Sequence, residues 1–200
     1  MNYISDILFW ISTGLLVPTV VLLVLFFVRA LLLVGGFFGP LLSRRKADAQ
    51  MDEVLNQLTA ENVDTLLDKL PSTGLGTAAP FYHRLVAAST DAPLREPVLA
   101  EFDIAADADQ NLPRTLAKMG PVLGLMGTLI PMGPALVGLS SGDIAGMAYN
   151  MQVVFATTVV GLVISLVGLI TLQYKQRWYT RDVSILEYVS SLLLEAQAKK

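Results

Sequence analysis

Three long apolar segments are the feature that most limits how this chain can fold. Charged side chains make up 16% of its 200 residues, yet they are almost absent from residues 7–42, 119–139 and 144–174. A run of about 20 apolar residues is long enough to cross the hydrocarbon core of a bilayer as a helix. We therefore predict an all-α membrane protein with three transmembrane helices in contact with the lipid bilayer.

A cleaved signal peptide is the alternative interpretation of the first segment. Residues 1–28 contain no Lys or Arg, and the apolar run from Ile7 to Val28 is longer than a signal-peptide core of about 7–15 residues. Both observations favour a retained first transmembrane helix with an interfacial extension over residues 7–42. Arg29 then lies near the inner interface, where it either reaches water with its long side chain or pairs inside the membrane.

The distribution of Lys and Arg predicts the orientation. Basic residues follow the first span at Arg44 and Arg45 and the third span at Lys175 and Arg177. Short cytoplasmic flanks of membrane helices carry an excess of Lys and Arg. We therefore expect the N-terminus outside and the C-terminus inside. The predicted segments are an external N-terminus (1–6), a cytoplasmic helical loop (43–118), an external turn (140–143) and a cytoplasmic C-terminal helix (175–200).

The predicted cytoplasmic loop shows helical apolar spacing over much of its length. The pattern breaks near Thr59, which we expect to cap a further helix, and a Pro- and Gly-rich loop follows over 71–80. Helices are expected over 81–89 and 93–118. These pieces are too short for an independent catalytic domain, so we expect long helices that prolong the membrane bundle into the cytoplasm.

After the third span, apolar residues again recur at helical spacing. Trp178 and Tyr179 stand at its start, where they fit an aromatic belt at the inner membrane interface.

The composition argues against several functional classes. The chain has no Cys and a single His, His83, so it lacks thiolate ligands and cannot build a His-rich metal site. Its net charge of −3 argues against nucleic acid as a partner. The sequence shows no nucleophile–base pair, metal cluster or phosphate loop, so we expect no enzyme, no catalytic residue, no metal and no cofactor.

Small and polar residues lie on one face of the second span and on one face of the third. At about 100° per residue, each set falls within an arc of about 100°. The second-span set is Gly120, Gly124, Gly127, Thr128 and Pro131, and the third-span set is Asn150, Thr157, Thr158, Gly161, Ser165 and Gly168. Close helix packing, an ion path and a polar partner helix are all compatible with this stripe, and the pattern alone favours packing.

The second and third spans contain no Asp, Glu, Lys or His. A subunit that moved protons alone would carry such a group at membrane depth. Asp143 lies in the turn between these spans, where we expect it to cap the third helix. If protons move here, another polypeptide must supply the titrating carboxylate.

Two segments of the stripe combine Gly and Thr with other residues at a characteristic spacing. A P-x-x-G-L-x-G-T segment is present at Pro121, Gly124, Leu125, Gly127 and Thr128. An A-T-x-x-G-L-V segment follows at Ala156, Thr158, Gly161, Leu162 and Val163. Together these segments resemble the paired signature of the MotA/TolQ/ExbB proton channel family. The order of spans and the cytoplasmic loop between the first two agree with this family. The length of that loop is closer to the ExbB/TolQ-like branch than to MotA.

The resemblance implies a proton-channel, stator-type subunit of a prokaryotic cytoplasmic (inner) membrane. It implies a homo-pentamer around a dimer of a single-span ExbD/TolR/MotB-like protein whose membrane Asp carries protons. Proton flow would then be coupled to mechanical work or transport. The expected proton-path residues are Thr128, Thr158, Thr157, Ser165 and Asn150, and the expected packing and motif residues are Pro121, Gly124, Gly127, Pro131, Gly161 and Gly168.

One departure from the family pattern and one alternative function remain. Pro131 stands where relatives often have Gly, and Pro134 follows, so we expect the second helix to break or tilt there. The alternative function is a non-conducting oligomeric membrane scaffold, in which the stripe only packs helices. An integral membrane enzyme is the weakest hypothesis, because the spans lack titrating groups.

Overall fold

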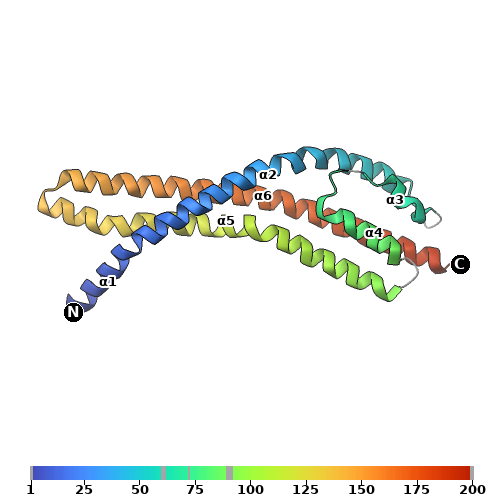
Figure 1. The fold of residues 1–200 in the computed structure, drawn as a ribbon, viewed down its shortest axis with the longest axis horizontal. Helices are drawn as coiled ribbons and strands as arrows, with labels where there is room; N and C mark the ends of the chain where they lie inside the picture. The colour runs from blue at the N-terminus through green and yellow to red at the C-terminus, as the bar shows by residue number, and fades with distance from the viewer. Residues whose placement is uncertain (1, 60–61, 72, 89–91, 199–200) are drawn as a thin grey trace. The chain divides into compact units, whose positions relative to one another are not determined.

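The computed structural model describes residues 2–59, 62–71, 73–88 and 92–198. Within these residues it contains helices and no strand, which confirms the all-α class (Figure 1). Residue 1 of the predicted N-terminal segment and residues 199–200 of the predicted C-terminal segment lie outside the described residues. The chain divides into two compact units, Met1–Gly35 with Leu112–Leu172, and Gly36–Asn111 with Gln173–Lys200.

Long helices dominate both units. The elements are α1 (Asn2–Gly14), α2 (Leu16–Asn56), the 3-10 turn η1 (Val63–Thr65), α3 (Leu66–Lys69), the 3-10 turn η2 (Gly76–Ala78), α4 (Ala79–Ala87), α5 (Ala92–Ser141) and α6 (Ile144–Ala198). Three helical segments are long and apolar enough to span a membrane: Ile7–Asn56, Arg95–Ser141 and Ile144–Ala198. The chain therefore has the helices of a multi-pass membrane protein.

In the first unit, α5 and α6 form an antiparallel hairpin that packs on the first half of α2 (Figure 1). Its small core consists of Leu23 and Ala30 from α2, Leu116 and Leu123 from α5, and Ile164 from α6. Other apolar side chains of these helices remain exposed, among them Leu25, Leu129 and Leu162. Such a surface suits a lipid environment, where apolar exposure has no cost.

The hairpin turn is built by two residues. Gly142 has a φ of 79°, a conformation that glycine adopts without strain. The Asp143 carboxylate then accepts a hydrogen bond of 2.9 Å from the backbone N–H of Gly146. This bond satisfies one free donor at the start of α6, so the predicted capping role of Asp143 is confirmed.

Of the break or tilt predicted at Pro131 and Pro134, the break is wrong. Helix α5 continues through both residues, and also through Pro113 and Pro121, to Ser141. Each proline lacks an N–H, so the carbonyl four residues earlier loses its hydrogen-bond donor within the helix. In water, this loss usually ends or kinks a helix. In a packed membrane helix, the surrounding helices hold the backbone and tolerate such residues. Pro131 is itself buried.

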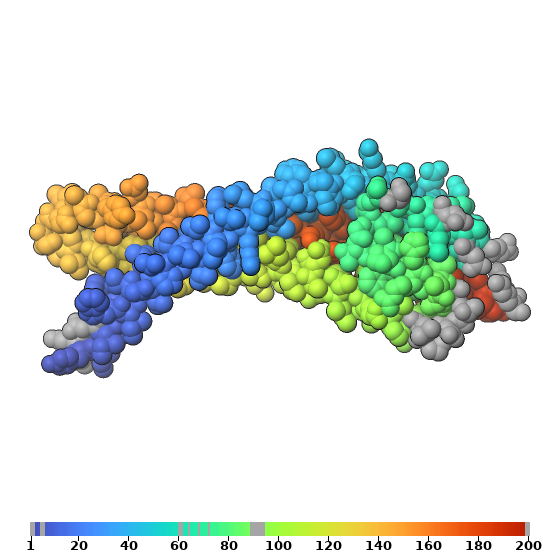
Figure 2. All heavy atoms as spheres, viewed as in Figure 1, coloured from blue at the N-terminus to red at the C-terminus, as the bar shows by residue number. Residues whose placement is uncertain are grey.

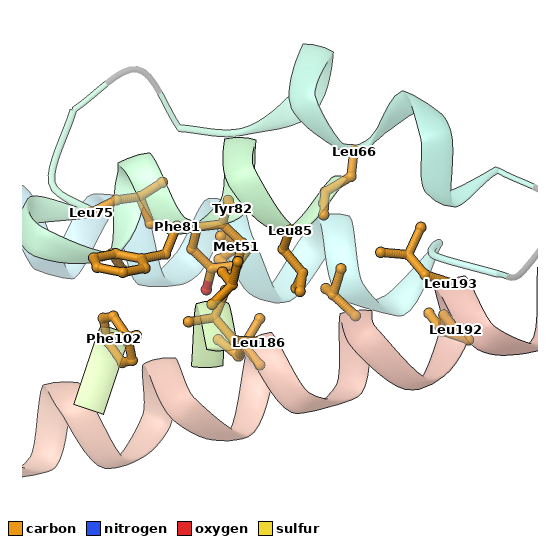
Figure 3. Packing of buried hydrophobic residues seen from close by; sticks show 14 of the residues in the cluster. Met51, Leu66, Leu75, Phe81, Tyr82, Leu85, Phe102, Leu186, Leu192 and Leu193 are labelled. Carbon is orange, nitrogen blue, oxygen red and sulfur yellow. The ribbon is translucent and has the colours of Figure 1, made fainter. Parts of the chain in front are cut away.

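The second unit has the larger apolar core. It gathers side chains from all its helices, including Met51 of α2, Leu66 of α3, Tyr82 of α4, Phe102 of α5 and Leu186 of α6 (Figure 3). In the space-filling view, the green atoms of α4 lie against the teal end of α2 (Figure 2). The segments between Asn56 and α5 thus complete a compact helical unit around the ends of the long helices.

A buried ion pair joins α2 to α6 in this unit. Arg44 donates to the carboxylate of Asp182, and their side chains are 6% and 1% exposed. Burial raises the pKa of Asp182 above its usual range, and the hydrogen bond from Arg44 opposes that shift. Asp48 accepts from Arg44 at 3.0 Å and also pairs with Arg181 at 3.3 Å. Arg44 therefore has a second hydrogen-bond partner besides Asp182, as a buried charge requires.

Two local predictions fail in the second unit. Thr59 is not a helix cap; its N–H donates to the Asn62 side chain at 2.7 Å in a turn before η1. Tyr179 is 9% exposed and donates to Asp109, so it belongs to the protein interior and not to an aromatic belt. Trp178 stacks on Phe37 with ring centroids 5.4 Å apart.

Candidate functional site

Glycines bring α5 and α6 into backbone contact within the first unit. A side-chain carbon at Gly120 would lie 2.6 Å from the carbonyl oxygen of Gly161, and one at Gly161 would lie 2.8 Å from the Cα of Gly124. Both distances are too short for real atoms, so only glycine fits. We call this contact the glycine seam, formed by Gly120, Gly124, Gly127, Gly161 and Gly168.

Two of the predicted polar residues lie inside this seam. Ser165 donates to the backbone carbonyl of Ala117 at 3.0 Å, which links α6 to α5 directly. Thr157 is 5% exposed, its hydroxyl donates to carbonyls of its own helix, and a side-chain carbon at Gly127 would collide with it. Within one chain, these two side chains take part in helix packing, the role that small polar residues commonly have in membranes.

Thr128 and Thr158 occupy a different position. Both are half-buried, at the rim of the seam. The Cα of Thr158 lies 3.7 Å from where a side-chain carbon on Gly124 would be. Gly124 itself lies one helical turn before Thr128 on α5. The Thr128 hydroxyl donates to the Leu125 carbonyl at 2.7 Å, and that of Thr158 donates to the Val154 carbonyl at 2.9 Å. The two threonines thus stand on neighbouring turns of the hairpin.

The hydroxyls of these two threonines can still act toward a second molecule. A hydroxyl has one donor and two acceptor lone pairs. Because each donor is held by the helix itself, each oxygen can accept a hydrogen bond from outside. A rotation of the side chain would instead present the hydroxyl proton. This pair of roles suits a group that contacts both the protonated and the ionised form of a carboxylic acid.

The remaining predicted residues are spread along the hairpin and α2. Asn150 is half-buried near the turn and donates to the Gly146 carbonyl at 2.9 Å. Pro121 is exposed and Pro131 is buried. Arg29 is exposed on α2 and forms no ion pair with a described residue.

Sequence reasoning missed part of this geometry. Thr19 of α2 is 3% exposed and its hydroxyl donates to the Leu15 carbonyl, so the first span also carries a buried polar residue. The spacing of small residues signalled an interface, but not which hydroxyls would face the seam and which would face outward. Among the described residues, no group of three or more His, Asp or Glu side chains could hold a metal.

Comparison with known proteins agrees with the two signature segments. A sequence model of the MotA/TolQ/ExbB proton channel family matches residues 76–188, which is more than half of the chain. The matched region contains the hairpin with the glycine seam, Thr128 and Thr158, together with part of the second unit. No curated protein matches the chain. The family match and the resemblance of the two segments lead to one conclusion: this chain belongs to the MotA/TolQ/ExbB proton channel family.

Proposed function

We propose that the chain is the channel-forming, stator-type subunit of a proton-driven complex in a prokaryotic cytoplasmic membrane. In this complex, a homo-pentamer surrounds a dimer of a single-span partner of the ExbD, TolR or MotB type. Proton flow between the two components drives mechanical work or transport. Membership of a proton channel family and three span-length helices support this proposal.

The observation that carries the proposal is the contrast between the seam and its rim. Within one chain, Gly120 meets Gly161 and Gly127 meets Thr157 at distances that leave no room for a water molecule. Thr128 and Thr158 remain half-exposed beside them, in spans without a titrating side chain. Their oxygens can therefore contact a group on another polypeptide, and a membrane carboxylate is the group that would complete a proton path.

Thr128 and Thr158 accordingly rank first as proton-path residues. Thr157 and Ser165 have hydrogen-bond partners inside the seam, and Asn150 lies near the turn, so they would act mainly by holding the hairpin in shape. Proton transfer would occur at the partner's carboxyl group. The threonines would accept its hydrogen bond when it is protonated and donate to it when it is ionised.

The test replaces each rim threonine by the isosteric valine. Thr128→Val and Thr158→Val remove the hydroxyl, and the loss of one hydrogen bond worth about 1.4 kcal/mol in the barrier slows flow about tenfold. Proton flux is measured with a pH-sensitive dye in inverted vesicles from cells that also make the native partner. Thr13→Val on α1 is the matched control, because that hydroxyl also donates four residues back along its own helix.

A non-conducting scaffold is the second candidate, and the glycine seam favours it. A scaffold does not conduct protons, so this hypothesis predicts that both rim variants keep their function in full. It also predicts that Gly124→Leu or Gly161→Leu disrupts the protein. Copurification from native membranes separates the two. A single-span chain with a membrane Asp inside the oligomer supports the channel, while an oligomer that contains this chain alone, together with unchanged flux in both rim variants, overturns it.

A further inference from the structure

Helix α5 presents an exposed face in the second unit that combines an apolar residue with acids. Ile104 is 70% exposed although it lies outside the apolar spans. Asp103 beside it is exposed and forms no ion pair with a described residue. We call this surface the α5 face; its residues are Ala100, Asp103, Ile104, Asp107 and Ala108, all exposed. Small alanines around one large apolar side chain permit close approach by another helix.

Helix α6 carries a complementary surface in the same unit. An open hollow of about 760 Å³ lies along it, with buried Ile185 among its lining residues. We call it the α6 hollow; the other lining residues are Gln173, Gln176, Arg177, Thr180, Arg181 and Ser184. Arg177 is exposed and forms no ion pair with a described residue. The hollow therefore offers aliphatic side-chain stems and positive charge, while the α5 face offers Ile104 and negative charge.

The two surfaces lie at the same height along the helices. Lys175 pairs with the Asp109 carboxylate at 2.6 Å, and the ring of Phe102 lies 6.1 Å from that of Tyr179. Because α5 and α6 run antiparallel, these contacts place Ile104 within about one helical turn, roughly 5 Å, of the height of Thr180. Thr180 is one of the residues that line the α6 hollow.

Equal height matters for a ring of identical chains. A closed ring relates neighbours by rotation alone, so a head-to-tail interface joins different surfaces at the same height along its axis. This step rests on the proposed function, and it takes the ring axis in the second unit to follow that unit's own long helices. Exposed Asp103 on one surface and exposed Arg177 on the other also favour this pairing over contacts between like surfaces, whereas Arg181 already pairs with Asp48 and Asp52 of its own chain.

We propose that the α5 face of one copy packs on the α6 hollow of the next copy around the ring. Ile104 would occupy the hollow near Thr180, and Asp103 would approach Arg177 of the neighbour. The occupant of the hollow is thus a second copy of this chain. The interface lies in the second unit and is separate from the glycine seam, which joins helices of a single copy.

The absence of Cys from the sequence makes a direct test possible. Two differently tagged variants of the full chain are made in the same cells, one with Ile104→Cys and the other with Thr180→Cys. A disulfide between the two tags can form only between copies. The matched control pairs Ile104→Cys with Ser191→Cys, which is exposed on α6 but about 16 Å further along the helix.

The expected result is a cross-linked dimer that carries both tags for Ile104→Cys with Thr180→Cys and at least tenfold less for the Ser191→Cys pair. The mass of the purified oligomer is measured in parallel. An intact oligomer without the tagged dimer, or with equal cross-linking in both pairs, overturns this interface and leaves the proposed function standing. A monomeric chain overturns both. Asp103→Arg should reduce the cross-link, and Arg177→Glu in the neighbouring copy should restore it.

Discussion

Gly161→Ala is the sharpest test of the glycine seam. The added methyl group would lie 2.6 Å from the carbonyl oxygen of Gly120 and 2.8 Å from the Cα of Gly124. Real contacts of this kind stay above 3.0 Å, so the two backbones must separate by at least about 0.4 Å. Neither contact can be relieved by a side-chain rotation, because both atoms belong to the backbone of α5.

The magnitude follows from two opposing effects. Overpacking of a tight interface costs about 1–3 kcal/mol. Replacing Gly by Ala inside a helix returns up to about 1 kcal/mol through higher helix propensity. The net loss is therefore about 1–2 kcal/mol, which lowers the melting temperature of a chain of this size by roughly 2–8 °C.

Gly35→Ala is the matched control for Gly161→Ala. Gly35 also lies inside a long helix of the first unit, but a side-chain carbon there meets no atom within 4 Å. Its variant gains helix propensity without a collision, so its melting temperature should stay equal or rise. Both variants are measured by thermal unfolding of the purified protein in detergent. If Gly161→Ala proves as stable as Gly35→Ala, the backbone contact at the seam is not as described.

Two further substitutions test the turn and the second unit. Asp143→Ala removes the cap of α6 and should lower the free energy of unfolding by about 0.5–2 kcal/mol, measured by thermal unfolding. Ser140→Ala in the same turn is the control and should be nearly neutral. Equal effects of the two variants would contradict the cap. Asp182→Asn leaves the buried Arg44 guanidinium with Asp48 as its remaining carboxylate partner, so the loss should be at or below the low end of the 3–5 kcal/mol that breaking a buried pair costs, about 3 kcal/mol. The double variant Arg44→Leu with Asp182→Leu should lose much less stability, and a double variant as unstable as Asp182→Asn would argue against the pair.

The sequence predicted the long helices because their apolar runs exceed what a soluble helix needs. It also predicted the turn at Asp143, since a capping residue beside Gly142 follows a local rule. It did not predict that α5 continues through Pro131. Intrinsic propensity treats proline as a breaker, and only the packing of neighbouring helices overrides it.

The candidate site was predicted in part for a similar reason. Helical periodicity placed Thr128, Thr157 and Thr158 on stripes, but it could not separate a side chain that faces the seam from one at the rim. That difference depends on where α5 and α6 cross. The Arg44–Asp182 pair was likewise invisible, because it joins residues far apart in the chain and each alone fits an exposed helix face.

The glycine seam has a consequence for proton leakage across the membrane before the complex is assembled. A membrane that stores a proton gradient must not leak protons. A channel subunit that is inserted before its partner could cause such a leak. At the crossing of Gly120 and Gly161, α5 and α6 approach so closely that not even a methyl group fits, so water cannot form a chain of hydrogen bonds there. Within a single copy, the seam therefore leaves no path for water at this crossing. In the proposed complex, proton conduction would begin only when several copies and the partner's carboxylate meet. Assembly of the complex would therefore control conduction.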